Sequence, residues 1–294
     1  MQTIEVPSAA AGIVAKLKLP GEHLVGVSRV ALEVMRLADD RNATGADLER
    51  IIESDPPLSA RLLRVANSAF YGARKPASSI SGAIHLMGFS AVKNIAMAAS
   101  LSRAFRGTGD LGTFEPGEVW KHSVAVGVGV RLIAVRNRQV DPHDAFLAGL
   151  MHDIGVMVEL QMARSNFIST LAAVSADPLL TFREAERLHV GATHETFGEA
   201  LCVSWNFPVM LREVCAFHHE PSQSQQAQRM LVSIVHVADV MAAQARLGYS
   251  RTVDAVGLGQ DVRDAIGLSV DELAAVQATL PEQVAIALQA LKAS

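Results

Sequence analysis

Cysteine is nearly absent from this 294-residue chain, which contains only Cys202 and Cys215. Two cysteines cannot build a disulfide framework, so we expect a reducing compartment. No stretch of about 18 uninterrupted apolar residues is present, so we expect no membrane-spanning helix. The opening residues MQTIEVP lack both a basic segment and a long apolar core, so we expect no signal peptide. Together these absences predict a cytoplasmic protein.

The chain is also poor in aromatic residues and in excess charge. Aromatic residues make up 5% of it and charged residues 19%, whereas half of the residues are hydrophobic. That mixture favours a packed helical protein over a β-sandwich or a disordered chain. The net charge of −4 provides no electrostatic footprint for nucleic acid or an anionic membrane, and we expect neither as a partner. DNA binding through short N-terminal helices is therefore the least favoured function.

Apolar residues recur at helical spacing along the chain, and no segment alternates with the period of a β-strand. The predicted fold class is therefore all-α. The expected N-terminal helices cover 24–37, a short segment around 48–52, 58–65, 80–87 and 91–101. The later ones cover 116–136, 142–160, 167–174, 182–188, 193–204, 208–217, 229–247, 269–278 and 281–292. Asp55 before two prolines predicts a helix start, and Gly88 predicts a helix end.

Composition also suggests where the chain divides. Three glycines within residues 106–112 make this segment the best internal linker. We therefore predict a tail at 1–20, an N-terminal helical subdomain at 21–107, a helical bundle at 108–247 and a helical extension at 248–294.

The most informative stretch is LAGLMHDIG, residues 147–155, where an apolar helix leads into His152 and Asp153. His122 shares a helix face with Val119 and Val126. Asp239 lies within the apolar run 231–241, where an unpaired carboxylate would cost several kcal/mol. We therefore expect Asp239 to have a cationic, hydrogen-bonding or metal partner.

Imidazole and carboxylate ligands in this order suit a divalent transition metal such as iron, manganese, nickel or zinc. The candidate ligands of a first ion are His122, His152, Asp153 and Asp239, and those of a second ion are His194, His218 and His219. Such an ion activates water and polarises a phosphoryl oxygen, and in an enzyme Asp153 would be the catalytic residue. Each element also has a structural explanation: His122 alone is typical of a hydrogen-bonded core histidine, and His218 and His219 suit a helix C-terminus.

Several motifs carry a family resemblance. They are DPPLSARLLRVANS at 55–68, FYG at 70–72, ISGAI at 80–84, LMG at 86–88, AGLMHDIG at 148–155, WNFP at 205–208 and HHEP at 218–221. With these motifs the chain, from about residue 20 to 220, resembles the HDOD domain (HD-related output domain) of the HD superfamily. The resemblance implies an N-terminal helical layer packed on an HD-like helical bundle.

The related HD-GYP phosphodiesterases, which cleave cyclic di-GMP, share the histidine order but differ at two places. Val156 stands where they carry a lysine, and PSQ at 221–223 replaces their Gly-Tyr-Pro loop. Both differences remove contacts expected for a nucleotide phosphate.

Two functions stay open. The HDOD resemblance implies a non-catalytic regulatory module of bacterial signalling that acts on signalling proteins, with a pocket able to hold a metal. The alternative is a metal-dependent phosphohydrolase acting on a nucleotide or another phosphoester. Phe70 and Tyr71 are the candidate exposed contact patch.

Overall fold

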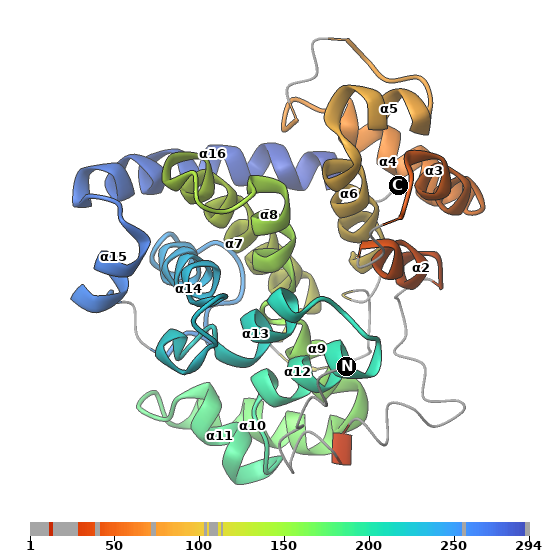
Figure 1. The fold of residues 1–294 in the computed structure, drawn as a ribbon. Coiled ribbons are helices and arrows are strands. Elements are labelled where there is room, and N and C mark those ends of the chain that lie inside the picture. Colours follow the sequence, from red (N-terminus) through yellow and green to blue (C-terminus); the bar gives the residue numbers. More distant parts are fainter. Residues whose placement is uncertain are drawn as a thin grey trace.

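The computed structural model describes residues 12–13, 29–38, 42–71, 75–102, 105, 111–112, 114–254 and 257–291. All assigned elements in these ranges are helical, which confirms the all-α prediction. Figure 1 shows a group of N-terminal helices, coloured red to yellow, beside a larger bundle coloured green to blue. Most of the expected tail at 1–20 and most of the expected linker at 106–112 lie outside the described residues.

The N-terminal layer consists of α2 (Arg29–Ala38), α3 (Gly45–Glu53), α4 (Pro56–Ala66), α5 (Ile80–Met87) and α6 (Phe89–Leu101). Asp55 caps α4, because its carboxylate accepts a hydrogen bond from the Leu58 amide at 3.0 Å and Pro56 opens the helix. Gly88 ends α5 with a φ of 88°, a conformation that favours glycine. The predicted start and stop signals are both confirmed.

Phe70 and Tyr71 pack between this layer and the bundle, and the predicted exposed contact patch is wrong. The Phe70 side chain is 6% exposed, and its ring lies 5.5 Å from that of Phe146 in the bundle. The guanidinium of Arg131 stacks 4.6 Å above the Phe70 ring. Burial against an aromatic ring and a cation stabilises the Phe70 side chain more than exposure would.

The bundle continues with α7 (Pro116–Asn137), α8 (Pro142–Met151), α9 (Ile154–Met162), α10 (Arg164–Ala176), α11 (Phe182–His189), α12 (His194–Ser204), α13 (Val209–Phe217), α14 (Arg229–Gln244), α15 (Gln260–Ile266) and α16 (Val270–Leu291). A short 3-10 helix spans Pro221–Gln223.

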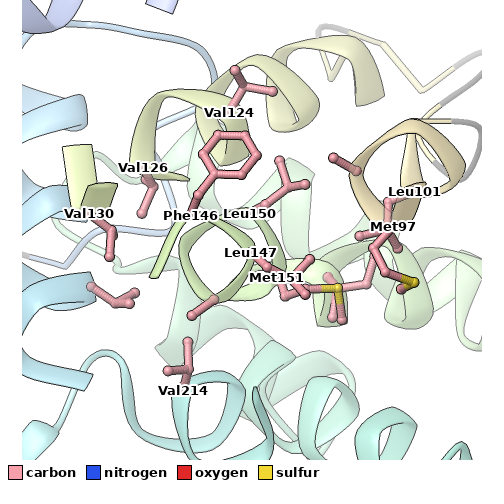
Figure 2. Packing of buried hydrophobic residues seen from close by; sticks show 14 of the residues in the cluster. Met97, Leu101, Val124, Val126, Val130, Phe146, Leu147, Leu150, Met151 and Val214 are labelled. Atoms are coloured by element: carbon pink, nitrogen blue, oxygen red, sulfur yellow. The ribbon is translucent and has the colours of Figure 1, made fainter. Parts of the chain in front are cut away.

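At the centre, α8 packs against α6, α7, α13 and α14. Figure 2 shows Phe146 beside Val126 of α7, and Met151 between Met97 of α6 and Val214 of α13. A Cβ on Gly149 would lie 2.8 Å from the Gly127 Cα, so α7 and α8 approach closely only because both positions are glycine. This contact sets α8, and the His-Asp pair that follows it, against α7.

One predicted helix, 142–160, is two helices in the structure. The helix α8 ends at Met151 and α9 begins at Ile154, with His152 and Asp153 in the turn between them. The stretch Pro142–Met162 is apolar and long enough to cross a membrane, but 89% of its apolar window is buried inside the protein, as in a core helix. The break directs the polar pair inward while both apolar halves stay in the core.

The C-terminal prediction of two short helices is also wrong, because α16 runs unbroken through Pro281. Leu280 and Val284 on either side of the proline are 0% and 1% exposed, and α16 packs on α7. That burial outweighs the backbone hydrogen bond that proline cannot donate. The helix α16 also reaches α4, as Figure 1 shows, and so ties the bundle to the N-terminal layer.

Candidate metal centre

Asp153 lies at the junction of α8 and α9, close to α12, and glycine makes this approach possible. A Cβ on Gly155 would collide with the backbone carbonyl of His194, the first residue of α12. The absence of a side chain at this position lets α9 and α12 pack backbone to backbone. The imidazole of His194 is thereby brought next to the carboxylate of Asp153.

We call His122, His152, Asp153 and Asp239 the first lobe. His122 Nε2 lies 2.8 Å from Asp239 Oδ1 and 4.0 Å from Asp153 Oδ2. His152 Nε2 lies 3.4 Å from Asp153 Oδ2 and 3.6 Å from Asp239 Oδ1. Asp239 therefore has the hydrogen-bonding partner that its place in an apolar helix required.

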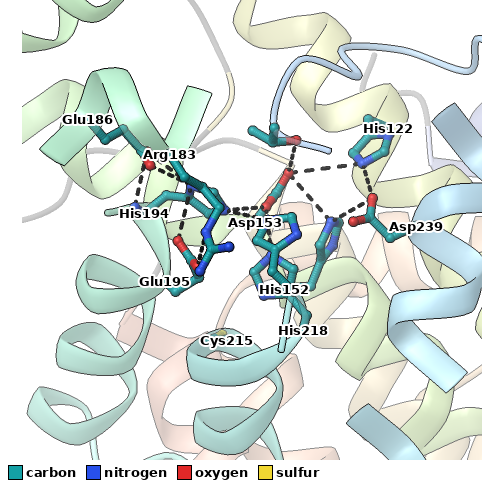
Figure 3. Close-up of polar contacts among 12 residues, drawn as sticks. His122, His152, Asp153, Arg183, Glu186, His194, Glu195, Cys215, His218 and Asp239 are labelled. Carbon is teal, nitrogen blue, oxygen red and sulfur yellow. Dashed lines mark hydrogen bonds and ion pairs between the residues drawn. The ribbon is translucent and has the colours of Figure 1, made fainter. Parts of the chain in front are cut away.

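The second lobe consists of Asp153, His194, His218 and His219. His194 Nε2 and His218 Nε2 each lie 3.4 Å from Asp153 Oδ1. His219 Nε2 lies 3.1 Å from His194 Nε2. In Figure 3 Asp153 stands between the two lobes, with His122 and Asp239 on one side and His194 on the other.

Every residue of the two lobes except His219 is buried. His122, His152, His194 and His218 are 0% exposed. Asp153 and Asp239 are each 1% exposed. The hydroxyl of Thr252, itself 0% exposed, donates a hydrogen bond of 2.9 Å to Asp153 Oδ2. A group of this chemistry at this depth needs hydrogen bonds or an ion to offset its desolvation.

The hydrogen bonds around the lobes leave metal-binding atoms free. His152 Nδ1 donates to the Gly149 carbonyl at 2.7 Å, and His218 Nδ1 donates to the Val214 carbonyl at 3.1 Å. A carbonyl only accepts, so in the neutral ring each Nε2 carries a lone pair. Within the described part of the chain, His152 Nε2, His218 Nε2 and Asp153 Oδ1 have no hydrogen-bond partner.

These orphaned, buried atoms are what a metal ion would engage. One nitrogen or oxygen from each of His122, His152 and Asp153 lies within 4.8 Å of the others, and the same holds for Asp153, His194, His218 and His219. The donor set of imidazole and carboxylate fits a divalent first-row ion. The residues present therefore fit the cofactor predicted from the sequence.

Electrostatics point to the same need for positive charge. Burial acts to lower the pKa of His152, but Asp153 and Asp239 outweigh it and raise that pKa to about 10. Burial acts to raise the pKa of Asp153, but the charge of His152 holds it well below its usual range. In the ion-free protein a proton on His152 therefore balances carboxylates that a bound cation would otherwise neutralise.

The seven residues predicted from the sequence all converge, but they differ in detail. His122 Nε2 is hydrogen-bonded to Asp239, and its Nδ1 is buried without a partner among the described residues. His122 thus fits its structural explanation as a core histidine as well as the ligand role. His219 is only partly buried, at the edge of the second lobe.

Sequence reasoning missed a layer of acidic residues behind the second lobe. Glu186 Oε1 accepts hydrogen bonds from His194 Nδ1 at 2.9 Å and from the His194 amide at 3.0 Å. This carboxylate fixes the imidazole so that Nε2 faces Asp153. Arg183 Nε lies 2.6 Å from Glu195 Oε1 and balances its charge.

Glu159, also missed, is 0% exposed, and neither of its oxygens has a hydrogen-bond partner among the described residues. Burial, reinforced by the charge of Glu186, raises the pKa of Glu159 to about 10. A carboxylate within the apolar run 154–162 needs a partner, and this reasoning, which identified Asp239, could have identified Glu159 as well. Glu186 gave no such signal, because it lies in a helix rich in charged residues.

Comparison with known proteins places the chain in a family. The HDOD domain profile matches residues 24–221, well over half of the chain. A protein of Treponema pallidum (strain Nichols), for which no function is named, is 22% identical over 240 residues, which are 81% of this chain and 46% of the relative. The chain thus spans about half the length of the curated relative it matches.

Solved structures share the fold. An HDOD domain protein of unknown function from Geobacter sulfurreducens superposes with a TM-score of 0.79 at 23% identity, covering 96% of each chain. A protein of Shewanella amazonensis SB2B, provisionally named a phosphohydrolase, superposes with a TM-score of 0.72 at 20% identity. The match covers 97% of this chain and 98% of the other. A provisionally named signal transduction protein of Marinobacter aquaeolei VT8 superposes with a TM-score of 0.76 at 19% identity. The match covers 98% of this chain and 67% of the other. The all-helical architecture is shared along nearly the whole chain, and the protein belongs to the HDOD domain family.

Proposed function

We propose that this protein is a regulatory module of bacterial signal transduction in the cytoplasm, which holds divalent transition metal in its two lobes and acts by contact with a signalling protein. The observation that carries the proposal is the position of Asp153. Its two oxygens face the Nε2 atoms of four histidines, His122, His152, His194 and His218, which come from four helices or their ends and are all 0% exposed.

The burial of the lobes supports regulation over turnover. A phosphoester substrate has to reach the ion, yet the carboxylate that would bind the ion is 1% exposed and is covered by Thr252. Val156, at the position where the related phosphodiesterases carry a lysine, is 0% exposed in the core. The site therefore offers ligands for a metal, whereas the nearby cation Arg183 already pairs with the carboxylates of Glu195, Glu220 and Asp254.

A metal-dependent phosphohydrolase is the second candidate, and one observation favours it. Asp153 presents one oxygen to each lobe, as a carboxylate that bridges two ions would. Paired ions stabilise the attacking and leaving oxygens of a phosphoryl transfer. A structural neighbour from Shewanella amazonensis SB2B is provisionally named a phosphohydrolase.

Metal analysis joined to a hydrolysis assay separates these functions. The purified full chain would be measured for iron, manganese, nickel and zinc by mass spectrometry, and then assayed with bis(p-nitrophenyl) phosphate. His152→Ala and His218→Ala remove one ligand from each lobe, and exposed His85→Ala is the matched control.

We expect metal in the wild type and in the His85→Ala variant, a loss of metal in each lobe variant, and no turnover. Turnover that disappears in His152→Ala would establish the phosphohydrolase and overturn the regulatory proposal. A folded protein that takes up none of the four metals would end both.

A further inference from the structure

A separate cavity lies beside the metal centre and contains none of its candidate ligands. Its volume is about 310 Å³, and its lining residues are Phe114, Leu171, Val174, Ser175, Pro178, Tyr249 and Arg251. They come from the segment before α7, from α10 and the loop after it, and from the segment after α14. A cavity of this size is at the lower end of the range that holds small organic ligands.

The lining combines aromatic walls with a single positive charge. The rings of Phe114 and Tyr249 meet edge to face, with centroids 5.0 Å apart, and leave apolar surface toward the cavity. Arg251 Nη2 donates to the Val174 carbonyl at 2.6 Å, which holds the guanidinium at the cavity. A guanidinium has five N–H donors, so this bond leaves others for an anion. No carboxylate is among the lining residues.

We propose that this cavity binds a small aromatic anion, with its ring against Phe114 and Tyr249 and its carboxylate, sulfonate or phosphate on Arg251.

The cavity wall is also part of the cover of the metal centre. We call residues 248–254 the covering segment. Arg251 and Tyr249 line the cavity, whereas Thr252 next to them donates to Asp153. The ring of Tyr249 lies 6.1 Å from that of Phe182, which in turn lies 6.2 Å from the imidazole of His194. The segment therefore touches both the cavity and the two lobes.

The covering segment is fixed tightly at its beginning. Gly248 has a φ of +88°, and a Cβ there would collide with the Glu118 carbonyl and the His122 amide. The Tyr249 amide donates to the same Glu118 carbonyl at 2.9 Å. A ligand that orders Tyr249 and Arg251 thus acts on a segment already anchored on α7. This coupling rests on the proposed function: we expect such a ligand to change the affinity of Asp153 for a metal, because Thr252 in the same segment donates a hydrogen bond to Oδ2 of that carboxylate.

The binding test uses 8-anilinonaphthalene-1-sulfonate, an aromatic anion whose fluorescence rises on binding, with the full chain stripped of metal. Uncharged N-phenyl-1-naphthylamine is the paired probe. Arg251→Gln removes the charge, Arg251→Lys keeps it, and Ser175→Trp places a large ring at an exposed helical position that lines the cavity. Exposed Arg187→Gln, on α11 outside the cavity, is the control.

We expect saturable 1:1 binding of the sulfonate, weakened at least about fivefold in Arg251→Gln, restored in part in Arg251→Lys and unchanged in Arg187→Gln. Ser175→Trp should abolish binding of both probes. The uncharged probe should not distinguish Arg251→Gln from wild type. Equal sulfonate binding in wild type, Arg251→Gln and Ser175→Trp would overturn the proposal, since the dye would then lie elsewhere.

A second measurement tests the link to the metal centre. The zinc dissociation constant would be measured with and without saturating sulfonate, in wild type and in Thr252→Val. Linkage is reciprocal, so a sulfonate that changes the zinc affinity must bind the zinc form with an affinity changed by the same factor. We expect a shift of about threefold or more in wild type and none in Thr252→Val. A wild-type zinc affinity unchanged by the sulfonate would refute the coupling. Sulfonate binding without any zinc uptake would refute the proposed function while the cavity assignment stood.

Discussion

Thr252 and Asp153, 99 residues apart in the sequence, meet in the interior, where the threonine hydroxyl donates a hydrogen bond of 2.9 Å to Asp153 Oδ2. The bond occupies the oxygen that faces the first lobe and leaves Oδ1 to the second. It also closes the segment after α14 over the site. One side chain therefore gives a buried carboxylate a hydrogen-bond donor and covers it from water.

Thr252→Val should destabilise the protein by about 1 to 3 kcal/mol, because a buried carboxylate oxygen loses its donor without a change in side-chain shape. Thr252→Ser, which keeps the hydroxyl, should lose less. Urea unfolding at pH 7.5 measures both. A valine variant as stable as the wild type would show that the hydrogen bond contributes nothing.

Gly155→Ala adds only one methyl group but should strongly destabilise the fold. The new Cβ would collide with the His194 carbonyl, so α9 and α12 would have to separate, at a cost of about 3 kcal/mol or more. Gly117→Ala is the matched control, since a Cβ at that exposed helical position meets nothing within 4 Å. Thermal melting compares the two, and a Gly155→Ala protein that melts like the control would contradict the backbone contact.

Glu159→Gln should change how stability depends on pH. Burial raises the pKa of Glu159 to about 10, against about 4.3 for an unfolded chain. The folded state thus keeps a proton that the unfolded state releases, and stability is fully present below the unfolded pKa and falls as the pH rises toward 10. Glutamine cannot titrate, so its stability advantage over wild type should grow by about 2.7 kcal/mol from pH 6 to pH 8, which is about 1.36 kcal/mol per pH unit. Urea unfolding across this range measures it, with exposed Glu53→Gln as control. A difference independent of pH would show that Glu159 is ionised in the folded state.

Arg183→Gln should loosen the covering segment. The guanidinium lies 2.6 Å from Glu195, 2.7 Å from Glu220 and 3.0 Å from Asp254, and its side chain is 12% exposed. Its loss leaves three carboxylates facing one another, at a cost of about 3 kcal/mol. Amide hydrogen exchange should rise in residues 249–254, whereas the Arg187→Gln protein should exchange like wild type. Unchanged protection in both variants would rule out the ion pairs as the anchor.

The sequence alone predicted the fold class, most helix bounds and the seven candidate ligands that the structure brings together, because each rests on a local pattern. Asp55 and Gly88 act on their own helices, and a histidine or aspartate in an apolar run is conspicuous wherever its partners lie. The local pattern could not show which of these residues contact one another. That Asp153 faces both lobes follows from the approach of α9 to α12, which is a tertiary contact at Gly155.

The errors also have tertiary causes. The 142–160 helix breaks at His152 because the polar pair turns inward, and α16 continues through Pro281 because Leu280 and Val284 are buried around it. Phe70 was predicted to be exposed because its cationic neighbour, Arg131, is distant in the sequence and no local pattern indicates their contact. Glu186 and Thr252 were missed for the same reason: each acquires its role from a residue of another segment.

If both lobes bind an ion, as proposed, the sharing of Asp153 between two groups of histidines would make the two occupancies interdependent. An ion in one lobe draws electron density from the common carboxylate, and so weakens it as a donor to the other. A metal titration of this protein should therefore show two binding steps of unequal affinity. The ion that binds first lowers the affinity of the other lobe for the second ion. A pocket of this kind responds to metal concentration over a wider range than two independent sites of equal affinity would.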